Sequence, residues 1–471
     1  MGGVNRTKGG TGGVNLTGLR SHNAALVLDL LRTAGTEGIS RLELAERTGL
    51  TPQAVSKITG RLREDGLAAD AGRRASTGGK PRTVLRLVPE AGHAVGVHLD
   101  RDELRAVLVD LDGTVVGERR VPVDLGAGAH AVVERVARET EALLGEGWRP
   151  ESGSGATSGA GAGPGAGAGL GPGAGAGVGP GAGPGAGAGL GPGAGAGVGP
   201  GAGPGAGAGL GPGAGAGLGP GAGAGVGPGA GPGAGAGPGP GPGAGAGPGA
   251  GAVLGVGIAL PGPLDHARGV LHRVTGFPEW DGFPLRDALA ARLGVPVVVD
   301  KDTNAAALGL AVGGVGGSFA YLHLGTGLGA GLVIGGVVHR GARTGAGEFG
   351  HQVIQLDGPV CGCGNRGCVE ALCLAAVRRG DMEEAARVLG VGAGNLVGLL
   401  DIDLVLLGGR TVAAAPEVFV RGVGAVLEER ARREGGGEGA VPVRIASGGA
   451  RGVAEGAAQL LLAPLFGRAG G

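Results

Sequence analysis

The sequence lacks charge over one long stretch: no Asp, Glu, Lys or Arg occurs between Ser152 and Leu264. Most of this stretch is a repetitive Gly-Ala-Pro tract, and glycine accounts for 118 of the 471 residues. Such a composition offers too little apolar surface to offset the conformational entropy lost on ordering. We therefore expect residues 151–251 to form a disordered low-complexity insert. Neutral repeat expansion is a simpler interpretation of this insert than any specific role.

Cysteine is also scarce, because the chain has only four, all within residues 361–373. Four cysteines in a chain of this length do not make a disulfide scaffold. The N-terminal residues lack the apolar core of a signal peptide, and no run of about 18 apolar residues free of Gly and Pro occurs. These absences predict a cytoplasmic protein of a reducing compartment.

The formal net charge is zero, but the charge is unevenly distributed. Residues 1–90 carry 14 Lys or Arg against 8 Asp or Glu. A basic end on a neutral protein favours a polyanionic partner. A solvated basic face would give the same count, so charge alone does not decide between the two.

The N-terminal segment predicts an amphipathic helix followed by a helix-turn-helix. Residues 21–35 carry leucines at helical spacing and end at a glycine. Ser40, followed three residues later by Glu43, matches a capping box that starts a second helix. Three apolar residues of this second helix are expected to face a core: Leu42, Leu44 and Ala45.

Gly49 is expected to end the second helix in a tight turn, and Thr51 to cap a third helix that begins at Pro52. Two helices joined by such a turn are typical of the helix-turn-helix, whose second helix enters the DNA major groove. Side chains off the apolar stripe of that helix can contact bases or phosphates. The candidates are Thr51, Gln53, Ala54, Ser56, Lys57 and Arg61.

Two β-rich runs follow Gly66 and flank a turn rich in glycine and basic residues, which predicts a β-hairpin wing. Its basic residues suit phosphates or a minor groove: Arg73, Arg74, Lys80 and Arg82. A helical bundle with a surface hairpin is the alternative. DNA binding is favoured because caps, turn, apolar stripe and basic wing agree. Such regulators usually bind near-palindromic operators as dimers, so we expect a homo-oligomer, associated with the nucleoid.

The next part of the chain predicts three strands from Val95 onward and then a helix that begins near Ala129. The Gly-Ala-Pro tract follows, and an apolar strand resumes near Val253. The tract therefore interrupts a strand–helix–strand unit. Such an insertion is tolerated because the cost of loop closure rises slowly with length.

The C-terminal half predicts a ligand site. The strand Val295–Val299 leads into Asp300 and Asp302, and a helix is expected from about Asn304. Carboxylates at the end of a buried strand beside a helix N-terminus are a usual ligand position in α/β sheets. The turn GTGLGAG, residues 325–331, exposes backbone N–H groups, although such a turn is a weak signal alone.

The stretch GEFGHQVIQLDGPVCGCGNRGCVE, residues 347–370, predicts a structural zinc site. Three cysteines and a histidine can form a closed tetrahedral site, which leaves no position for activating water. The expected ligands are His351, Cys361, Cys363 and Cys368. A four-cysteine site with Cys373 is the alternative. Cys373, however, lies on a helix expected from about Val369 and is more simply a small buried residue.

These motifs, in this order, resemble the ROK family, which comprises bacterial sugar kinases and sugar-responsive repressors. The resemblance covers residues 19–148 and 252–466. It rests on SRLELAERTGLTPQAVSKI, STGGKPR, GIALPGPLD, DKDTNAAALG, LGTGLGAGL, GEFGH and CGCGNRGCVE.

The resemblance implies an α/β fold, with a winged helix-turn-helix ahead of an actin-like (ribonuclease H-like), two-lobed domain of the sugar-kinase type. The implied divisions are residues 19–90 for the DNA-binding domain, 91–150 for the first part of the ROK-type domain, 151–251 for the insert, and 252–466 for the remainder with the zinc loop.

The resemblance also implies roles for single residues. Asp302 corresponds to the family's catalytic base, and Glu348, His351 and Glu370 to its sugar-hydroxyl contacts. His351 would then serve both the zinc and the sugar, so that the zinc loop shapes the sugar site.

Three departures from the family pattern bear on activity. Where the kinases have an Asp-x-Gly-Gly-Thr phosphate loop, this chain has LDRDE, residues 99–103. The Asn that precedes the family's catalytic Asp is Lys301 here, and the segment between Glu370 and Asp401 is short for the family.

The sequence therefore predicts a sugar-responsive transcriptional regulator, and more specifically a repressor of carbohydrate genes. Its kinase-like domain is expected to be catalytically silent. A sugar or sugar phosphate would be its effector. An active ATP-dependent sugar kinase with an added DNA-binding domain is the alternative, and a regulator that has lost its effector is a third hypothesis.

Overall fold

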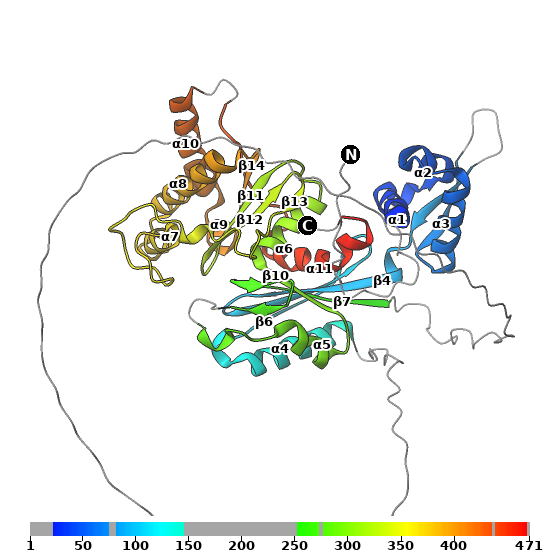
Figure 1. Ribbon diagram of the computed structural model, residues 1–471, viewed down its shortest axis with the longest axis horizontal. Helices are drawn as coiled ribbons and strands as arrows, with labels where there is room; N and C mark the ends of the chain where they lie inside the picture. Colours follow the sequence, from blue (N-terminus) through cyan, green and yellow to red (C-terminus); the bar gives the residue numbers. More distant parts are fainter. Residues whose placement is uncertain (1–21, 75–81, 146–251, 273–276, 436–438, 469–471) are drawn as a thin grey trace, which may run out of the picture. The chain divides into compact units, whose positions relative to one another are not determined.

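The computed structural model describes residues 22–74, 82–145, 252–272, 277–435 and 439–468 (Figure 1). The insert expected at residues 151–251 and the wing residue Lys80 lie outside the described residues.

The N-terminal elements form a three-helix unit with a small sheet. The elements are α1 (His22–Ala34), η1 (Gly35–Glu37), β1 (Ile39–Ser40), α2 (Arg41–Thr48), α3 (Pro52–Glu64), β2 (Ala68–Arg74) and β3 (Arg82–Leu87). The sheet has the strand order β1-β3-β2, and β2 and β3 form an antiparallel hairpin. This arrangement is a winged helix-turn-helix.

Local chemistry explains where α2 and α3 begin. The Ser40 side chain accepts a hydrogen bond from the Glu43 amide, and the Glu43 carboxylate accepts one from the Ser40 amide, so the predicted capping box is confirmed. The Thr51 side chain caps α3 by accepting a hydrogen bond from the Ala54 amide at 3.2 Å. Gly49 joins the helices in a left-handed conformation with φ +69°.

One core prediction for α2 is wrong. Leu44 and Ala45 are buried, but Leu42 is 42% exposed. Two residues along a helix correspond to a rotation of about 200°. Leu42 therefore lies on the face opposite Leu44.

The first large sheet has the strand order β10-β7-β4-β5-β6. Strands β4, β5 and β6 run antiparallel in sequence, whereas β7 pairs parallel with β4 and β10 parallel with β7. Helices α4 and α5 cover one face of this sheet, and α11 packs against β4 and β7 on the other (Figure 1). The bounds are β4 (Gly92–Leu99), β5 (Glu103–Asp110), β6 (Val115–Pro122), α4 (Ala129–Leu144), β7 (Ala252–Leu260), α5 (Leu285–Leu293), β10 (Val297–Lys301) and α11 (Gly452–Leu465).

We call this sheet with α4 and α5 the first lobe. Four short elements lie within the first lobe: η3 (Leu125–Ala127), β8 (Leu264–Asp265), β9 (Val270–Leu271) and η4 (Pro278–Trp280). Two others lie before β4 and before α11: η2 (Pro89–Ala91) and η6 (Gly449–Arg451). The tract of residues 151–251 enters the chain between α4 and β7, as the sequence predicts.

The second large sheet has the strand order β13-β12-β11-β14-β15. Helix α6 packs against β11 and β12, while α7, α8 and α10 share a separate apolar core with the same sheet. We call this sheet with α7, α8 and α10 the second lobe. The bounds are α6 (Asp302–Val312), β11 (Phe319–Leu324), β12 (Leu328–Ile334), β13 (Val337–Val338), η5 (Phe349–His351), α7 (Val369–Arg378), α8 (Met382–Leu400), β14 (Leu404–Gly408), α9 (Arg410–Ala414), α10 (Pro416–Glu434) and β15 (Val443–Ile445).

These two sheets and their helices confirm the expected α/β class. The observed boundary between β10 and α6 differs by two residues from the predicted one. The sequence predicts the strand at Val295–Val299 and the helix from Asn304, whereas β10 ends at Lys301 and α6 starts at Asp302. Asp302 therefore occupies the first turn of a helix, where the helix dipole favours a carboxylate.

Helices α6 and α11 pack closely because glycines remove side chains at the points of contact. A Cβ on Gly257 of β7 would overlap the carbonyl oxygen of Ala457 in α11, and one on Gly456 would overlap that of Ala305 in α6.

No helix in the described part of the chain is both long and apolar enough to cross a membrane.

The glycine contact predicts a stability difference between two matched substitutions. Gly257→Ala should lower the free energy of unfolding by about 1–3 kcal/mol, because the methyl group forces β7 and α11 apart. Gly424→Ala should leave stability unchanged or raise it by about 0.5–1 kcal/mol, because this position of α10 has open space and alanine favours a helix. Urea unfolding of both variants measures the difference, and equal stability would contradict this account of the packing.

Candidate functional site

The four residues matched to the sugar site line one small polar pocket. Its volume is about 80 Å³, and it lies where β10 ends, beside the turn between β11 and β12. The structure brings together Asp302, Glu348, His351 and Glu370. These residues come from α6, the segment before η5, η5 itself and α7, so only the tertiary fold makes them neighbours.

Two of these carboxylates are fixed by backbone amides. Asp302 accepts a hydrogen bond from the Thr303 amide at 2.6 Å, and Glu370 accepts one from the Leu328 amide at 2.8 Å. Glu370 thereby ties the first turn of α7 to the start of β12. The glycine-rich turn expected to hold a ligand contributes Gly327 and Gly329 to the same pocket.

Lys301 occupies part of this pocket. Its ammonium donates hydrogen bonds to Glu348 Oε1 at 2.8 Å and to the carbonyl oxygen of Ala346 at 2.7 Å, and its side chain is only 5% exposed. One predicted sugar contact is therefore already engaged by a residue of the chain. A sugar that binds through Glu348 must displace this ammonium or share the carboxylate with it.

The β4–β5 turn carries a second ion group, which the sequence did not reveal. Arg410 of α9 binds Asp102 through both of its terminal nitrogens, at 2.9 and 2.7 Å, and contacts Asp100 at 3.2 Å. The hydrogen bond from Arg410 lowers the pKa of the Asp102 carboxyl and raises that of the guanidinium. Because Arg410 lies about 300 residues from its partners, no local pattern signals this pairing.

This pairing changes how the turn is understood. The turn LDRDE, residues 99–103, carries three carboxylates, which would repel a phosphate donor. In the structure Arg410 offsets one of the two negative charges of Asp100 and Asp102, and no glycine occurs in the turn. A phosphate would therefore meet side chains where the family's loop has glycines, together with an arginine already paired with carboxylates.

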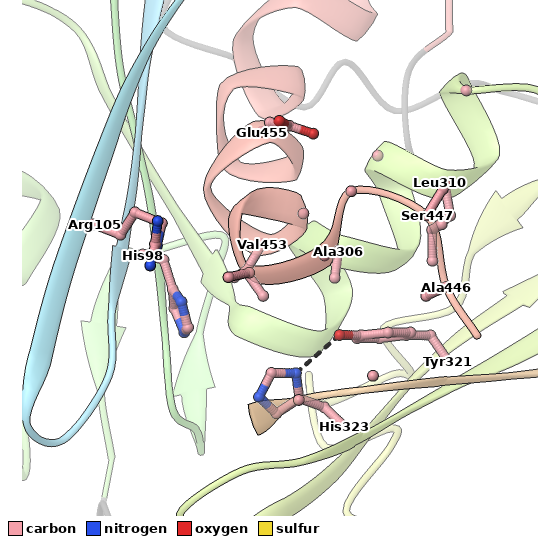
Figure 2. Close-up of a pocket in the computed structure, with 18 of the residues that line it drawn as sticks. His98, Arg105, Ala306, Leu310, Tyr321, His323, Ala446, Ser447, Val453 and Glu455 are labelled. Atoms are coloured by element: carbon pink, nitrogen blue, oxygen red, sulfur yellow. Dashed lines mark hydrogen bonds between the residues drawn. The ribbon is translucent and has the colours of Figure 1, made fainter. Parts of the chain in front are cut away.

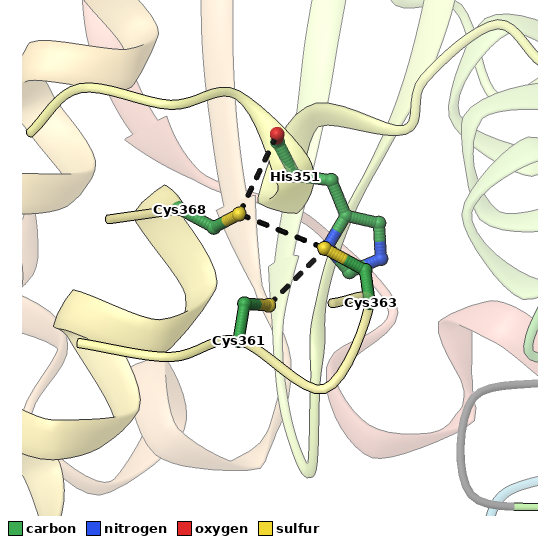
Figure 3. A group of neighbouring side chains, drawn as sticks. All are labelled: His351, Cys361, Cys363 and Cys368. Carbon is green, nitrogen blue, oxygen red and sulfur yellow. Dashed lines mark hydrogen bonds between the residues drawn. The ribbon is translucent and has the colours of Figure 1, made fainter. Parts of the chain in front are cut away.

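The predicted metal ligands lie together (Figure 3). The donor atoms of His351, Cys361, Cys363 and Cys368 are all within 4.8 Å of one another. The Cys363 and Cys368 sulfurs are 3.7 Å apart, as are the Cys361 sulfur and His351 Nδ1. Donors about 2.3 Å from a tetrahedral Zn²⁺ would be separated by roughly 3.7 Å. The group can hold a metal ion, and the donor spacing fits Zn²⁺.

Cys373 is outside this group. It is fully buried in α7, as expected, and its sulfur donates a hydrogen bond to the Ala385 carbonyl at 3.5 Å. His351 both belongs to the metal group and lines the polar pocket. The loop that carries the metal group therefore contributes to the wall of that pocket.

The helix-turn-helix presents its predicted DNA-reading residues outward. On α3, Gln53, Ser56, Lys57 and Arg61 are exposed, Ala54 is partly exposed, and Thr51 caps the helix. Arg73 and Arg82 are exposed on the hairpin, whereas the side chains of Arg74 and Lys80 are outside the described residues. Their contact with DNA stays a prediction.

Two protein-family models match this chain, one in the N-terminal unit and one in the C-terminal domain. Residues 27–68 match the winged helix-turn-helix DNA-binding family, and residues 248–379 match the ROK family. The chain carries a ROK family domain behind a winged helix-turn-helix. The resemblance inferred from the motifs is therefore confirmed.

This chain is similar to both kinases and repressors. It is 43% identical over 129 residues to a glucokinase of Thermotoga maritima, which covers 26% of this chain and 40% of that protein. It is 28% identical over 221 residues to a xylose repressor of Caldicellulosiruptor bescii, which covers 38% of this chain and 55% of that protein. The chain thus spans about half the length of the curated relatives it matches.

A solved ROK family transcriptional regulator, a homolog of the E. coli MLC protein, shares the fold. The match has a TM-score of 0.60 at 17% identity and covers 95% of this chain and 98% of that structure. At this identity the likeness concerns the fold alone.

The metal group predicts a difference between two cysteine variants. Cys361→Ser should lose about one equivalent of bound zinc and lower the melting temperature, because a structural zinc contributes directly to folding. Cys373→Ser should retain the zinc, because its sulfur faces Ala385. Metal content measured on the purified proteins tests this, and zinc loss from Cys373→Ser would favour the four-cysteine alternative.

Proposed function

We propose that this ROK protein is a sugar-responsive DNA-binding transcriptional regulator, and more specifically a repressor of carbohydrate genes. The observation that carries the proposal is the joint presence of an exposed recognition helix and a polar pocket of the ROK sugar-site type in one chain. Relatives named xylose repressor and glucokinase make xylose and glucose the first effectors to test.

The proposal assigns a role to each part of the chain. Residues 19–90 bind an operator, which is near-palindromic because the active form is a homo-oligomer. Residues 91–150 and 252–466 form the effector domain, with Asp302, Glu348, His351 and Glu370 as sugar contacts. The metal is a structural zinc, and the protein acts in the cytoplasm at the nucleoid.

Effector binding can reach the DNA-binding unit because the two share a core. Leu28 and Leu31 of α1 pack with Ala458, Leu462 and Phe466 at the C-terminal end of the chain. A sugar that draws the lobes together around Asp302 shifts α11, which packs against both α6 and β4. Movement of α11 then displaces α1, because the two helices share this core.

We propose further that the domain is catalytically silent. The Asp302 carboxylate remains in the pocket, and this favours the alternative of an active kinase, as does the glucokinase relative. Against it stand the β4–β5 turn without glycines and the commitment of Arg410 to Asp100 and Asp102. Both features hinder the close approach of a triphosphate.

The recognition helix predicts a charge-dependent DNA effect. Lys57→Ala should weaken binding to a promoter fragment, including the protein's own, and should reduce the salt slope of log K by about 1 if Lys57 contacts a phosphate. Arg421→Ala removes the same charge from an exposed position of α10 and should leave binding unchanged. Fluorescence anisotropy at several salt concentrations measures both. Absence of salt-sensitive, sequence-selective binding by the wild-type protein would contradict the proposal.

The polar pocket predicts a sugar response that depends on Asp302. Xylose or glucose should raise the melting temperature of the wild-type protein, because a ligand that binds only the native state stabilises it. Asp302→Asn should reduce the shift while DNA binding without sugar stays intact. A thermal-shift titration measures this, with Asp403→Asn, located in the turn before β14, as a matched control.

Two results would change the assignment. Transfer of phosphate from ATP to glucose above background would show an active kinase and overturn the silent domain. A sugar shift that is equal in the wild type and in Asp302→Asn would move the effector site away from this pocket.

A further inference from the structure

The four donors of the metal group differ in their access to solvent. Cys361 and Cys368 are buried, with 4% and 0% of their surface exposed, and His351 is half-buried. Cys363 is exposed. The residue after it, Gly364, has φ +94° and open space where a side chain would be. Cys363 is therefore the sulfur that a small oxidant in solution reaches first, on a segment with room to move.

The nearest partner for the Cys363 sulfur is Cys368. Their Sγ atoms are 3.7 Å apart and face each other across the group (Figure 3). The Cys361 sulfur instead faces His351 Nδ1 at 3.7 Å and Glu370 Oε1 at 3.9 Å. A disulfide has its sulfurs about 2.05 Å apart, so Cys363 and Cys368 would need to approach by roughly 1.7 Å. The structure thus brings one exposed and one buried sulfur close to bonding distance.

The metal group also joins the two chain segments that carry pocket residues. His351 ends η5, and Cys368 is the residue that precedes the first turn of α7. Glu370 follows two residues later, lines the polar pocket and accepts a hydrogen bond from the Leu328 amide. Two pocket residues, His351 and Glu370, are therefore held in place through the same four donors.

Backbone bonds tie the same two segments independently of the donors. Val353 forms an isolated bridge with Cys368, and the Val369 amide donates to the Gln352 carbonyl at 2.9 Å. Opening the metal group would leave these bonds in place. The segments would loosen, and the second lobe would stay folded.

We propose that the metal group is a redox-sensitive switch, in which a hydroperoxide oxidises Cys363 and Cys368 to a disulfide and the metal ion is released. The Cys363 sulfur attacks the peroxide, the O–O bond breaks, and a sulfenic acid forms as one oxygen leaves as water. The Cys368 sulfur then attacks the sulfenic sulfur, the S–S bond forms, and the hydroxyl leaves as a second water. Two thiols lose two electrons and two protons in total, and the peroxide takes them up.

The consequence for the pocket follows from the donors that remain. A disulfide sulfur is no longer a thiolate ligand, so only His351 and Cys361 are left to hold the ion. His351 then loses its anchor, and the polar pocket binds its effector less tightly. This consequence rests on the proposed sugar site, whereas the oxidation itself does not.

Hydrogen peroxide added to the zinc-loaded full chain tests the oxidation. A colorimetric chelator should detect about one equivalent of released zinc per chain. Peptide mass spectrometry should locate the new disulfide between Cys363 and Cys368. Dithiothreitol followed by added zinc should restore both the thiols and the bound metal.

Two variants separate Cys363 from the other cysteines. Cys363→His gives a two-cysteine, two-histidine donor set that also binds zinc, and its zinc release should be at least about 10-fold slower because the exposed thiolate is gone. Cys373→Ser is the matched control and should release zinc within about 2-fold of the wild-type rate, since its sulfur faces Ala385. If Cys363→His does not retain zinc, the peptide map of the wild type decides.

Three results would overturn the switch: a disulfide between another pair of cysteines, zinc release without a disulfide, or equally fast release from Cys363→His. The link to the pocket is measured by the thermal shift with xylose or glucose, which should fall on oxidation and return on reduction. A shift that is unchanged by oxidation would contradict that link. The absence of any shift in the reduced protein would contradict the proposed sugar site, and zinc release would still test the switch.

Discussion

The close approach of α11 to both β4 and α6 is the constraint on which the rest of the structure depends. Side chains are absent where these elements meet: Gly96 and Gly257 face the α11 backbone, and Gly456 faces the backbone of α6. The two sheets are thereby joined through a pair of helices packed almost backbone to backbone. The polar pocket lies at the first turn of α6, and a cavity of about 450 Å³ is lined by both α6 and α11 (Figure 2).

Two basic residues modify what a ROK domain of this geometry can bind. Lys301 engages Glu348 in the polar pocket, and Arg410 joins the β4–β5 turn to α9. Each cation satisfies carboxylates that would otherwise face an open site. Lys301 is buried, and a buried ammonium without a partner is costly, so its pair with Glu348 stabilises the ligand-free arrangement. A sugar that binds through Glu348 must displace this ammonium or share the carboxylate with it.

The shared core between α1 and the C-terminal end of α11 gives the two functional parts of the chain a physical connection. Arg468 pairs with Asp29, and the Arg32 guanidinium stacks on Phe466. These contacts link residues separated by more than 400 positions. The end of α11 therefore supports the helix-turn-helix, and the predicted DNA-contacting side chains of α3 remain exposed.

The sequence by itself determined most of the features that depend on neighbouring residues. The capping box at Ser40, the Gly49 turn, the hairpin and the metal quartet all follow from spacing over a few residues to about twenty, and the ordered motifs indicated the ROK fold. Leu42 is an exception, because its apolar side chain was expected in the core but lies on the solvent-exposed face of α2. Only the tertiary structure decided that Arg410 meets Asp102, that Lys301 engages Glu348, and that Arg32 reaches a cavity of the ROK domain. Such pairings depend on long-range geometry, since charged side chains far apart in the chain carry no local pattern that specifies their partner.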